Sequence, residues 1–513
     1  MREGVGVMRE ERGGRSLQGA CGLLTCLLLL ACESDPVVVV GPMEPQAPQV
    51  AQPSGEPQPP QAQPPQAQTP VVTQPPQAQP IPPAGPSGRN WFVSTKGSDG
   101  AAGTREAPLR TIGRAVALAR PGEVIRVQPG VYPEELLLDS RGTGVAPITV
   151  RGEGSTRPVL VPKDRARSTV LLVRGRWNLD NLHIDVGGAR MFAVVYDNGA
   201  HQSVLSNSEL RSGTSGAGVL VEGGRDITIQ RNSIHHFIKS GDDSHGVAVV
   251  GASRNITIRD NDIHHNSGDS VQCQPGTVPP EGVLIEGNTL HDEGENGVDI
   301  KWCRNVTVRN NLLFGFPNTA IRPAGSSAGE GVVIHQAARN ILIKGNTISR
   351  AGRGVSVLGG ATSPENVWVE DNLIQEIRNF PAGNGHGIRI AGARNVRVSG
   401  NTVENTASYG LMLAADGLVV PGLVVRNNIL RGGSQPLLLR LGHDRFRPGL
   451  VLEGNHYAPG GILKADGVLE GLGGMAAGLQ EDFPGERLTL SSPEKLEVWR
   501  QALGADQGAG LLE

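Results

Sequence analysis

The feature that most restricts the fold of this 513-residue chain is a repeat that occupies most of its length. Short stretches alternate apolar and polar side chains and then turn at an asparagine, as in RNITIRDNDI (254–263), RNVTVRNNLL (304–313) and RNVRVSGNTV (394–403). Such alternation is typical of a β-strand with one buried face. By subtraction of residue numbers the asparagines recur 23 to 35 residues apart, at Asn232, Asn261, Asn288, Asn311, Asn346, Asn372, Asn401, Asn428 and Asn455. The repeat therefore predicts stacked units of about 27 residues, as in a solenoid.

A second short strand lies between these asparagine turns. It has the form Gly-apolar-x-apolar, as in GVAV (246–249), GVDI (297–300) and GIRI (387–390). Two or three strands per repeat with no helix between them describe a chain that coils upward, with parallel strands about 4.8 Å apart. The sequence thus predicts an all-β fold, a parallel β-helix of about twelve coils with an aliphatic interior and a ladder of asparagines.

Composition supports this architecture and restricts the function. Only 3% of the residues are aromatic, so a large interior has to be built from aliphatic side chains. The formal net charge is −3, so the chain does not have the excess of basic residues that is typical of a nucleic-acid-binding protein. We expect a monomer with no nucleic-acid partner.

Both ends of such a column expose unpaired backbone and apolar side chains, and both need a cap. Thr111 is predicted to start a helix that Pro121-Gly122 ends. Ser492-Pro493 is predicted to start a second helix, with Leu496 and Trp499 on one face. The predicted division of the chain is a signal peptide at 1–31, a tether at 32–89, the β-helix at 90–455 and a C-terminal cap region at 456–513.

The N-terminal residues indicate export. Arginines precede a short apolar run, Gly22 to Ala31, that cannot span a bilayer. Leu29-Leu30-Ala31-Cys32 resembles the lipobox of bacterial lipoproteins, which implies cleavage before Cys32 and a lipid on its thiol; a plain secretory signal is the alternative. The Pro- and Gln-rich segment that follows is predicted to be an extended tether. We expect an exported protein of the cell envelope, anchored to the membrane at Cys32, at the outer membrane or cell surface.

The repeat over residues 90 to 455 resembles the right-handed parallel β-helix of the pectate-lyase-like superfamily. The stretch WFVSTKGSDGAAGTREAPLRTIGRAVALARPGEVIRVQPGVYPE (91–134) is similar to the segment that opens many extracellular β-helix proteins, including family nine polysaccharide lyases. Proteins with this fold serve as lyases, hydrolases, epimerases, adhesins and scaffolds. Function therefore has to be argued from the outward side chains.

Aligning the Gly-apolar strands places Asp299 and Lys301 outward on one strand, about 7 Å apart along it. The first outward column then contains Ala248, Gln272, Asp299, Ser356, Arg389 and Met412. The second outward column contains Val250, Gln274, Lys301, Leu358, Ala391 and Ala414. The Asp299 and Lys301 pair is either a surface ion pair of small energetic value or part of a site.

Acidic turns precede the same strands. Asp242 and Asp243 lie in SGDDSHG, Asp269 in SGDS, and Glu293 and Glu295 in DEGENG. Oxygen ligands converging from adjacent coils are suited to Ca²⁺, and the resemblance to family nine lyases implies a calcium ion that neutralises a uronate carboxylate. The alternative is that glycine and aspartate occur here only because they suit tight bends.

The predicted chemistry is β-elimination from an acidic, uronate-containing polysaccharide. A lysine of lowered pKa would act as the base, with Lys301 beside Asp299 as the first candidate and Lys239 as the second. Arg322 would bind a sugar carboxylate, and His245 is a secondary acid or base. Polygalacturonase-type hydrolases distribute an acidic pair and a His-Gly over neighbouring coils, whereas this chain has both within residues 242–246. A carbohydrate-binding or adhesive β-helix without turnover and a structural scaffold remain the alternatives.

Two further residue groups carry open alternatives. The pairs His235-His236, His264-His265 and His291-Asp292 occupy equivalent turn positions, where structural stacking is favoured over a transition-metal site or a proton shuttle. Cys273 and Cys303 are predicted to form either a disulfide or two buried thiols.

Overall fold

The computed structural model describes residues 88–139, 146–323, 327–380, 384–413, 420–442, 449–465 and 487–513. The predicted signal peptide, Cys32 and the tether up to residue 87 lie outside the described residues. Within the described ranges, neither helix has the length and apolar character needed to cross a bilayer.

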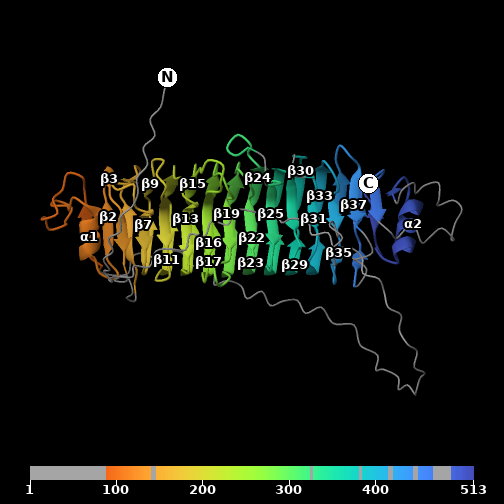
Figure 1. The fold of residues 1–513 in the computed structure, drawn as a ribbon, viewed down its shortest axis with the longest axis horizontal. Helices are drawn as coiled ribbons and strands as arrows, with labels where there is room; N and C mark the ends of the chain where they lie inside the picture. The colour runs from red at the N-terminus through yellow and green to blue at the C-terminus, as the bar shows by residue number, and fades with distance from the viewer. Residues whose placement is uncertain are drawn as a thin grey trace, which may run out of the picture. The chain divides into compact units, whose positions relative to one another are not determined.

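The chain winds through three sheets, because from β2 to β37 the pairing connects each strand to the third strand after it (Figure 1). The first sheet consists of β1 (Asn90–Val93), β2 (Val124–Val127), β5 (Ile148–Gly152), β8 (Trp177–Asp180), β11 (His201–Ser206), β14 (Arg225–Gln230), β17 (Arg254–Arg259), β20 (Glu281–Glu286), β23 (Arg304–Arg309), β26 (Arg339–Lys344), β29 (Glu365–Glu370), β32 (Arg394–Ser399), β35 (Val424–Arg426) and β38 (Val451–Glu453). The second sheet consists of β4 (Leu136–Leu138), β7 (Thr169–Val173), β10 (Phe192–Tyr196), β13 (Ala217–Glu222), β16 (His245–Val250), β19 (Val271–Gln274), β22 (Val298–Lys301), β25 (Glu330–His335), β28 (Arg353–Val357), β31 (Ile388–Ile390), β34 (Leu411–Leu413), β37 (Leu437–Leu441), β40 (Ile462–Ala465) and β41 (Arg487–Thr489). The third sheet consists of β3 (Val131–Pro133), β6 (Val159–Val161), β9 (His183–Asp185), β12 (Glu209–Arg211), β15 (Ser233–His235), β18 (Asp262–His264), β21 (Thr289–His291), β24 (Leu312–Phe316), β27 (Thr347–Ala351), β30 (Leu373–Ile377), β33 (Thr402–Thr406), β36 (Ile429–Gly432), β39 (His456–Tyr457) and β42 (Gly510–Leu511).

The predicted all-β solenoid of about twelve coils is confirmed. Pairing is parallel in all three sheets, apart from the antiparallel pair of β40 and β41 at the C-terminal end of the second sheet. The sheets continue past Asn455, since β39, β40 and β42 extend the same ladders.

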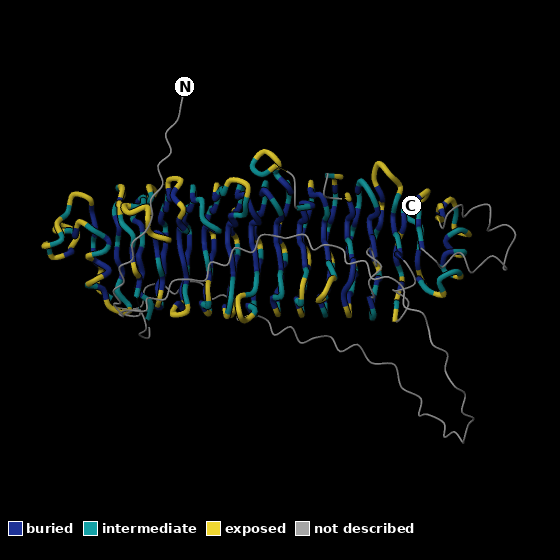
Figure 2. Tube along the Cα trace, in the orientation of Figure 1, coloured by how far each residue is buried: buried dark blue, intermediate teal, exposed yellow. Residues whose placement is uncertain are grey.

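Alternation along each strand produces the interior. Ile256 and Ile258 of β17 are fully buried, and they lie in register with Ile227 and Ile229 on the preceding coil. Figure 2 shows buried segments repeating along the strands of successive coils. Aliphatic side chains are therefore stacked coil upon coil, as the low aromatic content requires.

The asparagine ladder is also confirmed. Asn261 donates from its backbone N–H and its Nδ2 to Oδ1 of Asn288, both at 3.0 Å, and Nδ2 also donates to the carbonyl of Ile229 at 2.9 Å. The same pattern continues to Asn455, whose partner on the last coil is Oδ1 of Asp506. Because these side chains are almost fully buried, each amide satisfies backbone groups that have no access to water.

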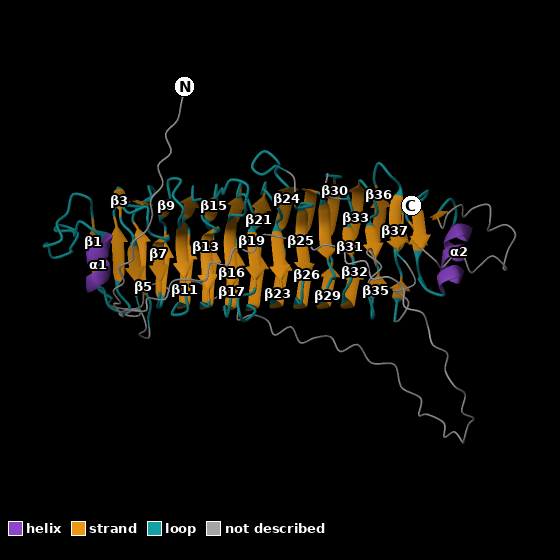
Figure 3. Ribbon diagram, viewed as in Figure 1, coloured by secondary structure: helices purple, strands orange, loops and turns teal. Residues whose placement is uncertain are grey.

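The two helices lie at opposite ends of the column (Figure 3). Helix α1 (Ile112–Leu118) begins after Thr111, whose side chain accepts a hydrogen bond from the N–H of Arg114. Helix α2 (Pro493–Leu503) buries Leu496 and Trp499 and ends at Gly504 in the left-handed conformation. Both predicted capping helices are thus confirmed, and their buried side chains belong to the same core as the strands.

Candidate functional site

The predicted site residues lie on the outer face of the second sheet and in the turns that precede its strands. Strand register confirms the first outward column, with one addition: Val333 of β25 lies between Asp299 and Ser356. The predicted second outward column lacks the same coil, because His335 of β25 is the register partner of Lys301. The coil of β25 was missed because a long connection separates β24 from β25. Its strand GVVI (331–334) has the same Gly-apolar form as the other strands and could have been found by that pattern.

Asp299 is the centre of the arrangement. Its Oδ2 lies 2.9 Å from Nζ of Lys301, and its Oδ1 lies 2.7 Å from Nε2 of His335. The Asp299 side chain is only 5% exposed, while those of Lys301 and His335 are 24% and 25% exposed. The pair is therefore a partly buried ion pair with a histidine attached to it, and the interpretation as an ordinary surface pair is wrong.

The expected lowering of the lysine pKa is also wrong. Burial alone would lower the pKa of Lys301, but the negative charges of Asp299 and Asp269 outweigh it and hold that pKa above its usual range. Burial would raise the pKa of Asp299, but Lys301 and His335 outweigh it and hold that pKa below its usual range. Lys301 is consequently a cation and Asp299 an anion at neutral pH.

His335 was not predicted from the sequence, and it has the geometry of an oriented base. An ionised carboxylate can only accept hydrogen bonds, so Nε2 of His335 donates to Asp299. In a neutral imidazole the lone pair then resides on Nδ1. The buried carboxylate thereby selects the tautomer and orientation of a partly exposed imidazole.

A second ion-pair group adjoins the first. Arg322, in the connection after β24, contacts Asp243 through Nη1 and lies 2.9 Å from Oε1 of Glu295 through the same atom. Burial, together with the nearby charges of Asp269 and Asp243, raises the pKa of Glu295 to about 9. Glu295 is therefore a protonated acid at neutral pH, and Arg322 joins the turn before β16 to the turn before β22.

Two of the predicted metal ligands are used by the protein itself. Glu293 is fully buried and accepts hydrogen bonds from the backbone N–H and Nδ2 of Asn266 and from Oγ of Ser270. Burial raises the pKa of Glu293 well above its usual value. Asp269 is likewise fully buried and accepts from Nδ2 of Asn296 at 2.9 Å. Both carboxyl groups close adjacent turns in the same way that the asparagine ladder does.

His245 and Lys239 each contact an acidic residue of the predicted site. Nδ1 of His245 accepts a hydrogen bond from the backbone N–H of Asp269 at 2.9 Å, and the ring is nearly buried. Lys239 forms an ion pair with Asp242 within the turn between β15 and β16. His245 thus supports the turn that holds Asp269, and Lys239 is neutralised locally.

The acidic side chains of the predicted calcium site already contact other groups of the protein. A metal site needs at least three ligand atoms close together. Within the described ranges, groups of three with all ligand atoms within 4.8 Å of one another occur at the histidines of the third sheet and not at these acidic turns. To bind calcium, these carboxyl groups would have to release their present partners. The pairs are Asp242 with Lys239, Asp243 with Arg322, Asp269 with Asn296, and Glu293 with Asn266. Calcium binding at Asp242, Asp243, Asp269, Glu293 and Glu295 stays a prediction.

The outer face of the second sheet becomes basic toward its C-terminal end. Arg389 of β31, Arg440 of β37 and Lys464 of β40 belong to the same outward column as Asp299, with Met412 between Arg389 and Arg440. Their spacing along the column follows the parallel strand separation.

A hollow of about 350 Å³ lies elsewhere, at the turns that follow β30 and β33. Its lining includes Glu376, Arg378, Asn405 and Ser434. None of these residues belongs to the Asp299 cluster, which lies on an open face instead.

Cys273 and Cys303 form a disulfide with 6.3 Å between their Cα atoms. Of the two alternatives, the disulfide is the one that the structure contains. It joins β19, which contains Cys273 next to Gln272, to the turn between β22 and β23, which contains Cys303.

Comparison with known families supports the fold. Residues 170–329 and 324–459 match the family model described as right handed beta helix region. Residues 95–137 match a model described as a protein of unknown function (DUF1565). The uncharacterized protein YwoF of Bacillus subtilis (strain 168) is 40% identical over 65 residues, which are 13% of this chain and 14% of that protein.

Solved structures resemble the chain at low identity. The catalytic unit of a GH87 alpha-1,3-glucanase from Streptomyces thermodiastaticus strain HF3-3 has a TM-score of 0.48 and 19% identity, over 63% of this chain and 60% of that one. A GH136 lacto-N-biosidase from Eubacterium ramulus has a TM-score of 0.45 and 12% identity, over 71% and 67%. An alginate lyase from Paenibacillus sp. str. FPU-7 has a TM-score of 0.41 and 16% identity, over 56% and 91%. The chain spans only 60% of the glucanase unit and 14% of YwoF, and no activity follows from these likenesses.

Proposed function

The chain belongs to the right-handed β-helix family, and from this premise we propose that it acts on a uronate-containing polysaccharide at the outer face of the second sheet. The proposed reaction is β-elimination. The observation that carries it is the buried carboxylate of Asp299, which bonds both a cationic lysine and a partly exposed histidine. A cation for the sugar carboxylate and an oriented base are the two groups that this reaction needs.

The roles of the residues follow from their charge states. Lys301, held protonated by Asp299, pairs with the uronate carboxylate and makes the proton on C5 more acidic. Nδ1 of His335 accepts that proton, the C4–O4 bond breaks, and a C4=C5 double bond forms. Protonated Glu295 supplies a proton to the leaving oxygen. Arg322 contacts Glu295 and holds it in position. We therefore assign binding of the sugar carboxylate to Lys301 rather than to Arg322.

The basic column formed by Arg389, Arg440 and Lys464 supports an acidic polymer over a neutral one. It continues the outward column of Asp299 on later coils, which places further cations along the path of an extended chain. Cationic grooves raise the local concentration of anionic ligands and their association rates. An export signal and a lipid at Cys32 would place this face outside the cell, and both belong to the proposal.

Hydrolysis is the second candidate, because a different contact favours it. Asp243 and Glu295 contact the same Nη1 atom of Arg322, and Glu295 retains its proton at neutral pH. Two carboxyl groups, one of them protonated, are the usual acid and base of glycoside hydrolysis. In this alternative Glu295 protonates the glycosidic oxygen and Asp243 attacks the sugar as the nucleophile, because two carboxyl groups that contact one nitrogen atom are too close together to leave room for an attacking water.

The test incubates the purified protein with pectate, alginate and glycosaminoglycans, with and without a chelator. Ultraviolet absorbance of the unsaturated uronate product reports elimination, and released reducing ends report any cleavage. We expect absorbance and reducing ends to rise together, and Lys301→Ala and His335→Ala to lose about 100-fold or more in rate. Lys344→Ala, which removes an exposed lysine of the first sheet, is the matched control and should keep full activity.

Each outcome separates the candidates. Reducing ends without absorbance would replace elimination by hydrolysis, and Glu295→Gln would then be the inactive variant. Binding without either product would leave a carbohydrate-binding or adhesive protein. Loss of activity with the chelator would support calcium, whereas unchanged activity would remove calcium from the reaction.

A further inference from the structure

A second group of ionisable side chains lies on the third sheet. Asp262 and His264 are on β18, and Ile263 between them is fully buried, so both point outward. His291 of β21 is the register partner of His264, and their rings stack with 4.8 Å between centroids. The predicted histidine stacking is thus confirmed, and it brings Asp262 within reach of both rings.

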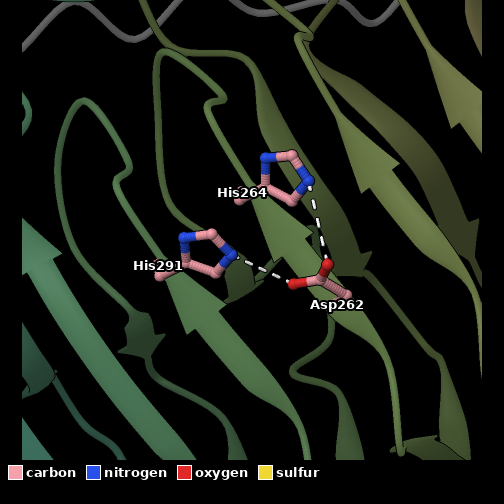
Figure 4. Close-up of side chains that lie close together, drawn as sticks. All are labelled: Asp262, His264 and His291. Carbon is pink, nitrogen blue, oxygen red and sulfur yellow. Dashed lines mark hydrogen bonds and ion pairs between the residues drawn. The ribbon is translucent and has the colours of Figure 1, made fainter.

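Both imidazoles face the carboxylate of Asp262, and Figure 4 shows one nitrogen of each ring directed toward a different carboxylate oxygen. Nε2 of His291 lies 3.0 Å from Oδ1 of Asp262, and Nε2 of His264 lies 3.9 Å from Oδ2 of the same carboxylate. All three ligand atoms lie within 4.8 Å of one another. Ligands of a tetrahedral zinc ion are about 3.3 Å apart, so closure needs movements of about 1.5 Å or less.

Each imidazole is already oriented by a partner on its other nitrogen. Nδ1 of His291 lies 2.8 Å from a carboxylate oxygen of Asp292, and Nδ1 of His264 lies 2.9 Å from Nδ1 of His265. In metal sites a histidine ligand typically donates its second N–H to a carboxylate or another acceptor, which fixes the tautomer. Asp292 and His265 are placed to accept such bonds, leaving both Nε2 atoms facing Asp262.

We propose that Asp262, His264 and His291 bind one divalent transition-metal ion. Two imidazole nitrogens and one carboxylate oxygen suit Zn²⁺ and its neighbours better than Ca²⁺ or Mg²⁺, which prefer oxygen ligands. The carboxylate of Asp262 is about half exposed, so an ion can enter from solvent. Three protein ligands leave a further coordination position for water.

Among the residues that the structure describes, such groups occur at one place in the ladder, and the adjacent coils show why. The register partner of Asp262 on the preceding coil is Ser233, and that of His291 on the following coil is Phe314. Phe314 continues the stack at 4.8 Å from His291 but offers no nitrogen. His265, His291 and Asp292 form a second such group, which shares His291 with the first. In the first group Nδ1 of His291 donates to Asp292, so this nitrogen cannot bind a second ion at the same time. One ion per chain is therefore expected.

These neighbours also supply conservative variants for the test. Asp262→Ser and His291→Phe each copy a side chain that the adjacent coil already carries in the same column. Zinc is titrated by calorimetry into wild type and both variants at neutral pH, with circular dichroism to verify the fold. His456→Ala, which removes an exposed histidine from β39 of the same sheet, is the control.

Wild type and the control should bind one Zn²⁺ per chain, and each ligand variant should bind at least 10-fold more weakly. Asp292→Asn should weaken binding by about 10- to 100-fold, since it changes the orientation of His291 and not the ligand set. Equal affinity in wild type and both ligand variants would overturn the proposal, because the ion would then be elsewhere. Absence of zinc binding by folded wild type would overturn it as well.

Discussion

Asp299→Asn is the change that most directly tests the electrostatic basis of the site. The substitution keeps the shape of the side chain and an acceptor for His335 but removes the negative charge 2.9 Å from Lys301. Removing one partner of a buried ion pair costs about 3–5 kcal/mol, because the other charge is left uncompensated. Lys301 is 24% exposed and can recover part of its hydration, so we expect a loss of about 2–3 kcal/mol.

The loss should be measured locally as well as globally. Coils of a solenoid contact mainly their neighbours, so unfolding of a long column need not be one cooperative step. Hydrogen exchange of the amides of β22 and β25 reports the opening free energy of these two coils, and urea denaturation reports the whole column. Exchange in strands several coils away, such as β4 and β7, serves as an internal control.

Two variants make the result specific. The double variant Asp299→Asn with Lys301→Met removes both charges and should recover most of the loss, since no charge remains unpaired. Glu365→Gln removes one partner of an exposed pair with Arg339, at 3.7 Å, and should change stability by about 0.5 kcal/mol or less. If Asp299→Asn were no more destabilising than Glu365→Gln, Asp299 would not hold the charge on Lys301, and the proposed site would lose its basis.

Two further predictions concern the acid and the ladder. Glu295 has a folded-state pKa raised from 4.5 to about 9, so the folded protein holds a proton that the unfolded chain releases, and stability should fall with rising pH across that window. In urea denaturation between pH 6 and pH 8, Glu295→Gln should reduce this decline by up to about 1.4 kcal/mol per pH unit, and parallel profiles would contradict the assignment. Asn288→Ala should cost about 2–4 kcal/mol, because the buried N–H of Asn261 and the carbonyl of Ile258 lose their partner. Hydrogen exchange that stays unchanged at Asn261 would show that water or a shifted neighbour replaces the amide.

Much of the fold follows from local physics that the sequence displays. The interior of β17 is set by the alternation of Ile256 and Ile258 with polar residues, and the turn after it is set by Asn261, whose amide has no alternative partners once buried. Both capping helices were predictable from Thr111 and Gly504, since capping depends on residues next to the helix ends.

The site was predictable only in part, because it combines residues from different coils. Asp299 and Lys301 are two positions apart on one strand, and alternation is sufficient to place them on the same face. His335 lies 36 residues beyond Asp299, after an irregular connection, and its contact depends on how many residues that connection uses. The charges of Asp299 and of Asp269, which precedes the neighbouring strand β19, outweigh the effect of burial and keep the proton on Lys301.

What the sequence by itself determined is therefore everything that repeats: the strand pattern, the inward and outward columns, and the ladders of asparagine and histidine. These depend on contacts between equivalent positions, and a period of about 27 residues is enough to define them. The tertiary structure alone decided which charges meet across coils, namely Arg322 with Asp243 and His335 with Asp299. The length of each connection sets those contacts, and their burial sets the protonation of each group, because the energy of a charge depends on its surroundings in three dimensions.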